Sequence, residues 1–176
     1  MRCFLLLKHF LPNEHANRIL DIRPEILAER GIKGIITDLD NTLVAWDSPE
    51  ATPELQIWFE EMRQEGIKVT IVSNNNEARV RDFSNPIDTP YIYKARKPMT
   101  KAFKKAIKDM GLKREEIVVI GDQLLTDVLG GNRLGVYTIL VVPVAKSDGW
   151  ATKFNRKMER YLLSAMKRKG WVDWED

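Results

Sequence analysis

Apolar runs that alternate with helical patterns constrain the fold of this chain more than any other feature of its sequence. The runs are residues 32–38, 67–72, 91–93, 117–122 and 136–142. Strands that alternate with helices form βαβ units, and such units build a parallel sheet with helices on both faces. The sequence therefore predicts an α/β fold with a doubly wound parallel sheet in a single domain.

The predicted helices have recognisable ends. Pro24 can open a short helix that Gly31 closes, because proline is tolerated at the first helical position and glycine favours a helix end. Thr52 and Pro53 open a second helix, and Gly66 ends it. Its apolar positions share one face, which predicts that this helix packs on the sheet; they are Leu55, Trp58, Phe59 and Met62.

The composition is that of a globular protein. The chain has 176 residues, 44% of them hydrophobic, which is enough for one domain with a core. We expect a helical segment at residues 1–31 that packs on the core, a core at 32–145 and a basic amphipathic helix at 146–176. A single cysteine and the absence of a long apolar run or a signal-like segment favour a cytoplasmic protein.

Polar side chains gather where the predicted strands end. In open parallel sheets, ligands bind outside the carboxyl ends of the strands, so these positions indicate a cleft and not the core. The residues concerned are Asp38, Asp40, Ser73, Asn74, Lys97 and Asp122.

The chemistry of these residues suits a phosphoryl group bound together with a metal ion. Asp38 and Asp40 would repel each other without a cation between them, and Mg²⁺ prefers oxygen ligands and often bridges to phosphate. Lys97 adds positive charge, and Ser73 offers a hydrogen-bond donor for phosphoryl oxygens. A carboxylate can also act as a nucleophile, while a second acid protonates the leaving oxygen.

Four short motifs carry a resemblance to a known family. They are DLDNT (38–42), SN (73–74), KP (97–98) and GDQLLTD (121–127). In order and type they resemble the four motifs of the haloacid dehalogenase (HAD) superfamily of phosphatases, over about residues 32–142. The whole chain looks most similar to the YqeG-like branch of subfamily IIIA, which is related to mitochondrial phosphatidylglycerophosphate phosphatases.

The resemblance implies a HAD-like Rossmannoid core and a role for each motif residue. It implies that Asp38 is the nucleophile and that Asp40 acts as general acid and then as base. It also implies that Mg²⁺ binds to Asp38, to the backbone carbonyl of Asp40 and to Asp122. The remaining implied roles are phosphoryl binding by Ser73, Asn74 and Lys97, orientation of water or Lys97 by Asp127, and support of the loop by Thr42.

The site is expected to be open. HAD phosphatases often carry an inserted cap, but residues 41–72 and 74–96 are too short to hold one. An open site suits a large or surface-bound substrate, or an oligomer in which a neighbouring subunit closes it. We therefore expect a lipid phosphate such as phosphatidylglycerophosphate as substrate. A small soluble phosphorylated metabolite is the alternative, and a non-catalytic phospho-regulated binding module is the alternative of another class.

Two nucleotide-binding interpretations and a receiver-domain interpretation have less support in the sequence than the phosphatase interpretation. The glycines of LGGNRLG (129–135) do not match GxGxxG, and no GxxxxGK[ST] loop is present. A receiver domain would place its phospho-acceptor at the end of a middle strand, where this chain has Ser73.

The carboxyl-terminal segment is basic and leaves two interpretations open. Between Ala151 and Gly170 Lys and Arg are frequent, and Glu159 is the single acid. The segment could be a helix packed on the sheet with a solvated charged face, or a helix in peripheral contact with an anionic membrane surface. Nucleic acid is not expected, because no recognition motif supports it. The apolar residues at helical spacing are Phe154, Met158, Tyr161, Leu162 and Ala165.

Overall fold

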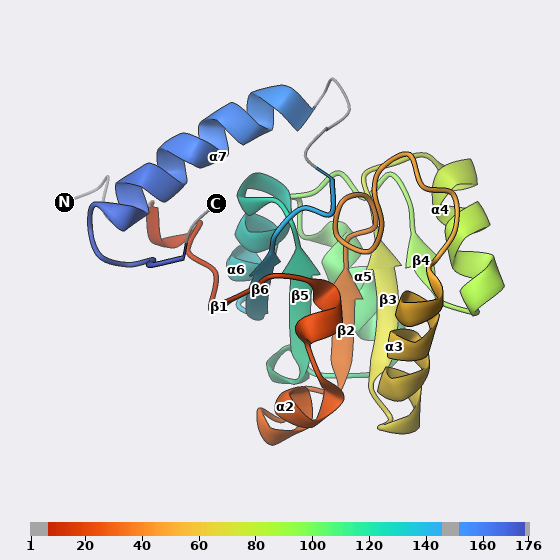
Figure 1. Cartoon of the computed structure of the whole chain (residues 1–176). Coiled ribbons are helices and arrows are strands. Elements are labelled where there is room, and N and C mark those ends of the chain that lie inside the picture. The colour runs from red at the N-terminus through yellow and green to blue at the C-terminus, as the bar shows by residue number, and fades with distance from the viewer. Residues whose placement is uncertain (1–6, 146–151, 175–176) are drawn as a thin grey trace.

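The computed structural model describes residues 7–145 and 152–174, which build a single domain around one parallel sheet (Figure 1). The six strands lie in the order β1-β6-β5-β2-β3-β4, and every pair of neighbours is parallel. The predicted α/β parallel sheet is confirmed. The strands are β1 (Glu14–Ala16), β2 (Gly34–Thr37), β3 (Lys68–Val72), β4 (Tyr91–Ile92), β5 (Ile117–Gly121) and β6 (Tyr137–Val141).

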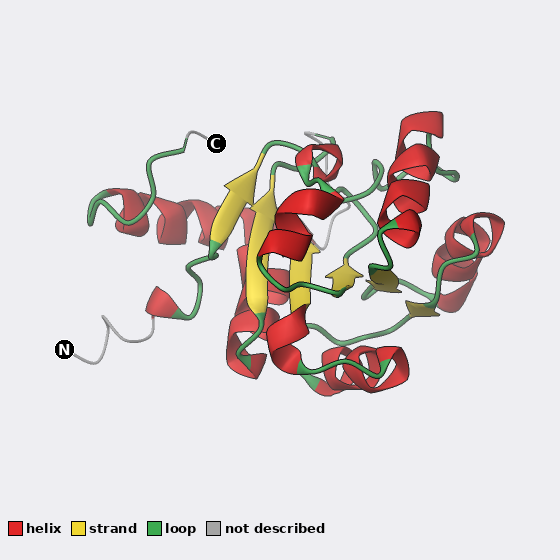
Figure 2. Ribbon diagram, turned by 90° about the horizontal axis from the view of Figure 1, so that it is seen from below, coloured by secondary structure: helices red, strands yellow, loops and turns green. Residues whose placement is uncertain are grey.

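Helices cover both faces of the sheet, as a doubly wound fold requires (Figures 1 and 2). The side chains of α2, α3 and α4 pack on one face, and those of α5 and α6 pack on the other. The main helices are α2 (Pro24–Glu29), α3 (Pro53–Gln64), α4 (Glu77–Ser84), α5 (Lys101–Met110), α6 (Leu129–Leu134) and α7 (Thr152–Lys167). The short turns are η1 (Ile19–Asp21), η2 (Asn85–Ile87), η3 (Arg114–Glu116) and the π-helical turn η4 (Leu124–Val128).

The local sequence explains where α3 and α5 begin and end. The side chain of Thr52 accepts a hydrogen bond from the backbone N–H of Leu55, which caps the start of α3. Gly111 has a φ of 69° after α5, a left-handed conformation that glycine adopts without steric cost. α5 buries Phe103 almost completely, and full burial of such a side chain contributes about 1.5–3 kcal/mol. These capped helices hold the sheet between two apolar layers.

The amino-terminal segment differs from the expectation in one element. Residues 14–16 form the edge strand β1, whereas the whole of 1–31 was expected to be helical. β1 pairs with β6, and the side chain of Asn13 accepts hydrogen bonds from the backbone N–H and the hydroxyl of Thr138. A three-residue strand is too short for a visible sequence period, so pairing with a distant strand decides its conformation.

α7 packs on the core through one side and exposes apolar residues on another. Leu163 packs with apolar residues of η4 and β6, and Met166 is fully buried. The carboxylate of Glu159 accepts a hydrogen bond from the backbone N–H of Leu125 at 3.2 Å. Met158 and Tyr161 are 47% and 67% exposed. The side chain of Phe154 lies outside the described residues. Among the described helices, none has the length and apolar character needed to cross a bilayer.

Candidate active site

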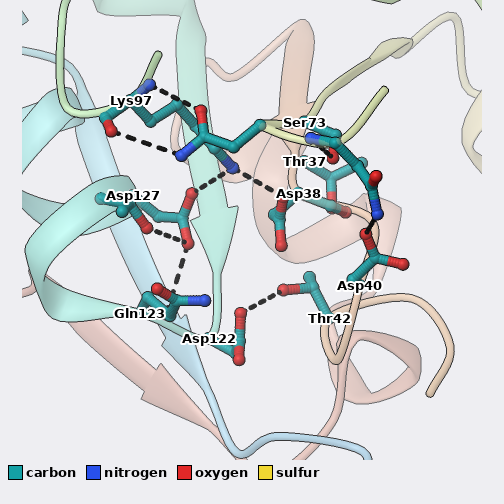
Figure 3. A network of polar contacts seen from close by, with 12 residues as sticks. Thr37, Asp38, Asp40, Thr42, Ser73, Lys97, Asp122, Gln123 and Asp127 are labelled. Atoms are coloured by element: carbon teal, nitrogen blue, oxygen red, sulfur yellow. Dashed lines mark hydrogen bonds and ion pairs between the residues drawn. The ribbon is translucent and has the colours of Figure 1, made fainter. Parts of the chain in front are cut away.

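The site lies at the carboxyl ends of the central strands, where the loops after β2, β3, β4 and β5 meet (Figure 3). The structure brings all eight predicted residues to this edge of the sheet. Asp38, Asp40 and Thr42 follow β2, Ser73 and Asn74 follow β3, Lys97 follows β4, and Asp122 and Asp127 follow β5.

Lys97 lies between two carboxylates in a buried ion-pair triad. Its Nζ donates to Oδ1 of Asp38 at 2.6 Å and to Oδ1 of Asp127 at 2.7 Å. The three side chains are only 3%, 9% and 2% exposed, respectively. Burial alone would lower the pKa of Lys97, but the charges of Asp127 and Asp38 outweigh it and raise that pKa. Lys97 is therefore a fixed cation beside Asp38.

The environment of Asp38 has opposing effects on its proton affinity. Burial raises the pKa of the Asp38 carboxyl, the ammonium group of Lys97 opposes this rise, and the charge of Asp127 adds to it. The net effect is a pKa above that of a free aspartate. A further positive charge next to Asp38 would therefore favour its ionised form.

A group of three buried acids offers oxygen ligands to a cation. One carboxylate oxygen each of Asp38, Asp122 and Asp127 lie within 4.8 Å of one another. The hydroxyl of Thr42 donates to Oδ1 of Asp122 at 3.1 Å and orients that carboxylate. Hard oxygen donors gathered in this way fit Mg²⁺ or a similar divalent ion. The side chain of Asp40 is not in this group.

Asp40 instead points towards two residues that the sequence analysis did not single out. Nδ2 of Asn75 donates to its Oδ2 at 3.0 Å, and Nε of Arg79 donates to its Oδ1 at 3.0 Å. Asn75 lies in the loop after β3, and Arg79 lies in the first turn of α4. An arginine three positions into a helix carries no motif, so the sequence offered no signal for this contact.

The loop after β2 is built to hold Asp38 and Asp40 on the same side. The backbone N–H of Asp38 still donates to Ile120 of β5, and the fully buried Leu39 anchors the chain to the core. Asn41 then adopts a φ of 66°, and its N–H donates to Val44 at 2.7 Å, which closes the turn. Asparagine tolerates this left-handed conformation better than most residues.

Ser73 and Asn74 organise the neighbouring loops. The hydroxyl of Ser73 accepts a hydrogen bond from the N–H of Asn75 at 3.1 Å. The side chain of Asn74 accepts from the backbone N–H of Lys97 at 2.7 Å and donates to its carbonyl at 3.3 Å. Asn74, predicted as a phosphate-binding residue, thus holds the backbone of Lys97 with both ends of its amide.

Gly121 allows Asp127 to lie against the end of β5. A Cβ at Gly121 would lie 2.2 Å from Cγ of Asp127, a distance that no side chain tolerates. Asp127 itself belongs to the π-helical turn η4, and its Oδ2 accepts from the N–H of Gln123 at 3.3 Å. The motif GD immediately after an apolar run is the sequence signal for this close approach.

Comparisons with known proteins identify the family. The HAD-hydrolase-like family model matches residues 94–161. The protein named probable phosphatase YqeG, from Bacillus subtilis (strain 168), is 66% identical over 172 residues, which cover 98% of this chain and 100% of that protein. The chain belongs to the HAD-like hydrolases. It is a phosphatase of this family.

Two further proteins to which the chain is similar are more distant in sequence. Phosphatidylglycerophosphate phosphatase 1, chloroplastic/mitochondrial, of Arabidopsis thaliana is 27% identical over 171 residues, which cover 91% of this chain and 49% of that protein. The cobalt-bound deoxy-D-mannose-octulosonate 8-phosphate phosphatase of Haemophilus influenzae has a TM-score of 0.53 at 17% identity, and the match covers 82% of this chain and 95% of that one. This last likeness shows the shared HAD-like fold.

Proposed function

We propose that the chain is a Mg²⁺-dependent phosphomonoester hydrolase that works through an aspartyl-phosphate on Asp38. The observation that carries the proposal is the buried contact of Lys97 with Asp38, 2.6 Å long, beside the carboxylates of Asp122 and Asp127. Such an arrangement presents a nucleophile, a fixed positive charge and oxygen ligands at one point.

In the first step, a carboxylate oxygen of Asp38 forms a bond to the phosphorus atom, and the bond from phosphorus to the ester oxygen breaks. Asp40 gives its proton to that leaving oxygen, which departs as an alcohol. In the second step, Asp40 takes a proton from water as the water oxygen bonds to phosphorus. The bond between phosphorus and Asp38 then breaks, which releases inorganic phosphate and restores the carboxylate.

The other residues hold the phosphoryl group and the metal ion. We assign Lys97 and Ser73 to the phosphoryl oxygens, and Asp38, Asp122 and the backbone carbonyl of Asp40 to the metal ion. Mg²⁺, when bound, supplies positive charge that offsets the charge on the phosphoryl oxygens during transfer. Asp127 is engaged with Lys97 at 2.7 Å, so its proposed role is to hold that side chain in place.

As the substrate of this phosphatase, we propose a lipid phosphate such as phosphatidylglycerophosphate. The Arabidopsis relative is named for that activity, although it is only 27% identical and much longer than this chain. The loops at the carboxyl end of the sheet also expose large apolar side chains: Trp46 is 44% exposed, Met99 60% and Val144 56%. Exposed apolar residues around an active site suit peripheral contact with a lipid surface.

A soluble phosphorylated metabolite is the second candidate. The glyceraldehyde 3-phosphate phosphatase of Pyrococcus furiosus is 28% identical over 87 residues, which cover 44% of this chain. The name of that enzyme refers to a small phosphate ester, so the substrate tests for this chain include soluble phosphate esters.

Phosphate release from phosphatidylglycerophosphate in vesicles and from soluble esters tests the proposal. Wild type would be compared with Asp38→Asn, in Mg²⁺ and in chelator. We expect at least a ~10²-fold loss in Asp38→Asn, because the amide is a poor nucleophile of nearly the same shape. Asp47→Asn is the matched control, since Asp47 is an exposed acid of the same loop. Equal rates in wild type and Asp38→Asn would overturn the mechanism, while turnover of soluble esters alone would overturn the lipid substrate.

A further inference from the structure

We propose that Arg79 is a positioning residue that holds the carboxyl group of Asp40 at the active site, an inference that rests on the proposed role of Asp40. Both oxygens of this carboxyl group have a donor. Nε and Nη2 of Arg79 lie 3.0 and 2.9 Å from Oδ1, and Nδ2 of Asn75 lies 3.0 Å from Oδ2. Contacts to both oxygens fix the direction of the carboxyl group as well as its place.

The guanidinium group of Arg79 is itself held in place. The backbone N–H of Arg79 donates to the side chain of Asn76, which caps α4. Its guanidinium carbon lies 5.7 Å from the centre of the Phe83 ring, one turn further along α4, and Phe83 is almost fully buried. Nη1 also lies 3.5 Å from the carbonyl oxygen of Pro49. Arg79 therefore connects α4, the loop after β2 and Asp40.

The burial of this ion pair distinguishes it from an ordinary surface pair. The side chains of Arg79 and Asp40 are 16% and 20% exposed, whereas those of Arg81 and Asp82 on the same helix are 48% and 65% exposed. Exposed ion pairs contribute little to stability, because solvent screens the two charges and both side chains stay free to move. A largely buried pair with a planar guanidinium group has a defined geometry.

The proposed reaction needs this geometry. Asp40 has to reach the leaving oxygen in its protonated form in the first step and the attacking water in its ionised form in the second, from the loop after β2. The ion pair with Arg79 describes the ionised form, and the contact of Asn75 with the other oxygen is available in both. A carboxyl group free to rotate in solvent would spend much of its time out of reach. Holding a catalytic group within a fraction of an ångström of its working position is a recognised source of rate.

A leaving-group comparison tests the inference. A p-nitrophenolate group leaves without needing a proton, whereas the alkoxide of glycerol 3-phosphate needs one. The constant kcat/KM reports the first step for both esters. We expect Arg79→Gln to lower kcat/KM by ~10²-fold for glycerol 3-phosphate and by only a few-fold for p-nitrophenyl phosphate, because general acid catalysis is worth ~10²–10⁴-fold. Arg79→Lys should recover part of the loss.

The double variant shows whether Arg79 acts through Asp40. Asp40→Asn combined with Arg79→Gln should be no slower on glycerol 3-phosphate than Asp40→Asn alone, since the two residues would form one unit. Arg81→Gln is the control, because it removes an arginine of the same helix that pairs with Asp82. Its kcat/KM should match wild type on both esters.

Three results with the Arg79 variants would overturn the inference. The first is an equal loss on both esters in Arg79→Gln, which would assign Arg79 to the phosphoryl group or to the fold. The second is no loss on either ester, and the third is a double variant whose losses multiply. If Asp40→Asn itself shows no dependence on the leaving group, the proposed role of Asp40 fails, and the inference about Arg79 fails with it. If Asp40→Asn shows that dependence and Arg79→Gln does not, only the inference about Arg79 fails.

Discussion

Asp127 packs directly against Gly121, so closely that a Cβ on Gly121 would lie 2.2 Å from its Cγ. The contact matters because Oδ1 of Asp127 is also 2.7 Å from Nζ of Lys97. The position of the Lys97 ammonium group therefore depends on the absence of a side chain at Gly121, the last residue of β5.

Replacing Gly121 with alanine should displace Asp127 and, with it, Lys97. We expect a loss of activity of at least ~10-fold, since a shift of about an ångström in a catalytic group can cost ~10²-fold. Steady-state kinetics and a thermal melt would measure the two effects. Gly131→Ala is the control, because its Cβ would lie 2.5 Å from the side chain of Thr138, away from the site. If Gly131→Ala loses as much activity as Gly121→Ala at similar stability, the contact with Asp127 has no special role.

Replacing Thr42 with valine should weaken metal binding. The Thr42 hydroxyl donates to Asp122 at 3.1 Å, and loss of such a support typically reduces metal affinity by ~10–100-fold. The concentration of Mg²⁺ that gives half-maximal activity should rise accordingly. Thr89→Val is the control, because the Thr89 hydroxyl donates to the backbone of Ile87 before β4. An unchanged Mg²⁺ requirement in Thr42→Val would contradict the prediction.

The raised pKa of Lys97 predicts how stability depends on alkaline pH. A group whose pKa is higher in the folded state stabilises the protein fully below its ordinary pKa, here 10.5, and this contribution is lost as pH rises through the folded value. The difference in unfolding free energy between wild type and Lys97→Met should therefore stay constant from pH 8 to about 10 and shrink above it. Urea titrations at several pH values would measure it; a difference that already falls between pH 8 and 9 would contradict the prediction.

Lys97→Met should also destabilise the protein at neutral pH. It leaves Asp38 and Asp127 buried without their cation, and removing one partner of a buried ion pair typically costs about 3–5 kcal/mol. Lys105→Met is the control, because Lys105 pairs with Asp109 on the exposed side of α5. Urea unfolding at pH 7 should separate the two variants by several kcal/mol, and equal stabilities would count against a tightly held triad.

The exposed apolar residues near the site should support binding to vesicles. Trp46→Ser combined with Met99→Ser should reduce co-sedimentation with anionic vesicles, because each removes exposed apolar surface. Ile57→Ser is the control, since Ile57 is 59% exposed on the outer side of α3. Equal binding of all three proteins would contradict a role for these loops.

Point substitutions, and not a deletion, are the appropriate test of whether α7 contributes to lipid binding. Deleting the helix would uncover the apolar residues of η4 and β6 that Leu163 contacts, so the truncated protein would be disturbed for other reasons. Met158→Ser with Tyr161→Ser changes only exposed side chains. Reduced sedimentation of this variant would support the membrane interpretation of the helix, and unchanged sedimentation would contradict it.

The features of the fold and the site that the sequence predicted correctly are those that depend on local patterns in the chain. The buried strand β2 followed by Asp38, and the apolar face of α3, both depend on residues close in the chain. The contact of Arg79 with Asp40 was missed because it joins residues 39 positions apart that share no pattern. The buried side of α7 was also missed: Met158 and Tyr161 follow the helical period but stay exposed, since the position of the helix on the core decides which residues are covered.

The pairing of β1 with β6 has a consequence for the synthesis of the protein. The hydrogen bonds between Asn13 and Thr138 join residues 125 positions apart, so β1 can pair with β6 only after β6 has been synthesised. Contacts of such long range form late, because the entropy of closing a long loop opposes them. The edge of β6 stays unpaired until β1 covers it, and an unpaired strand edge is a site where another chain can pair.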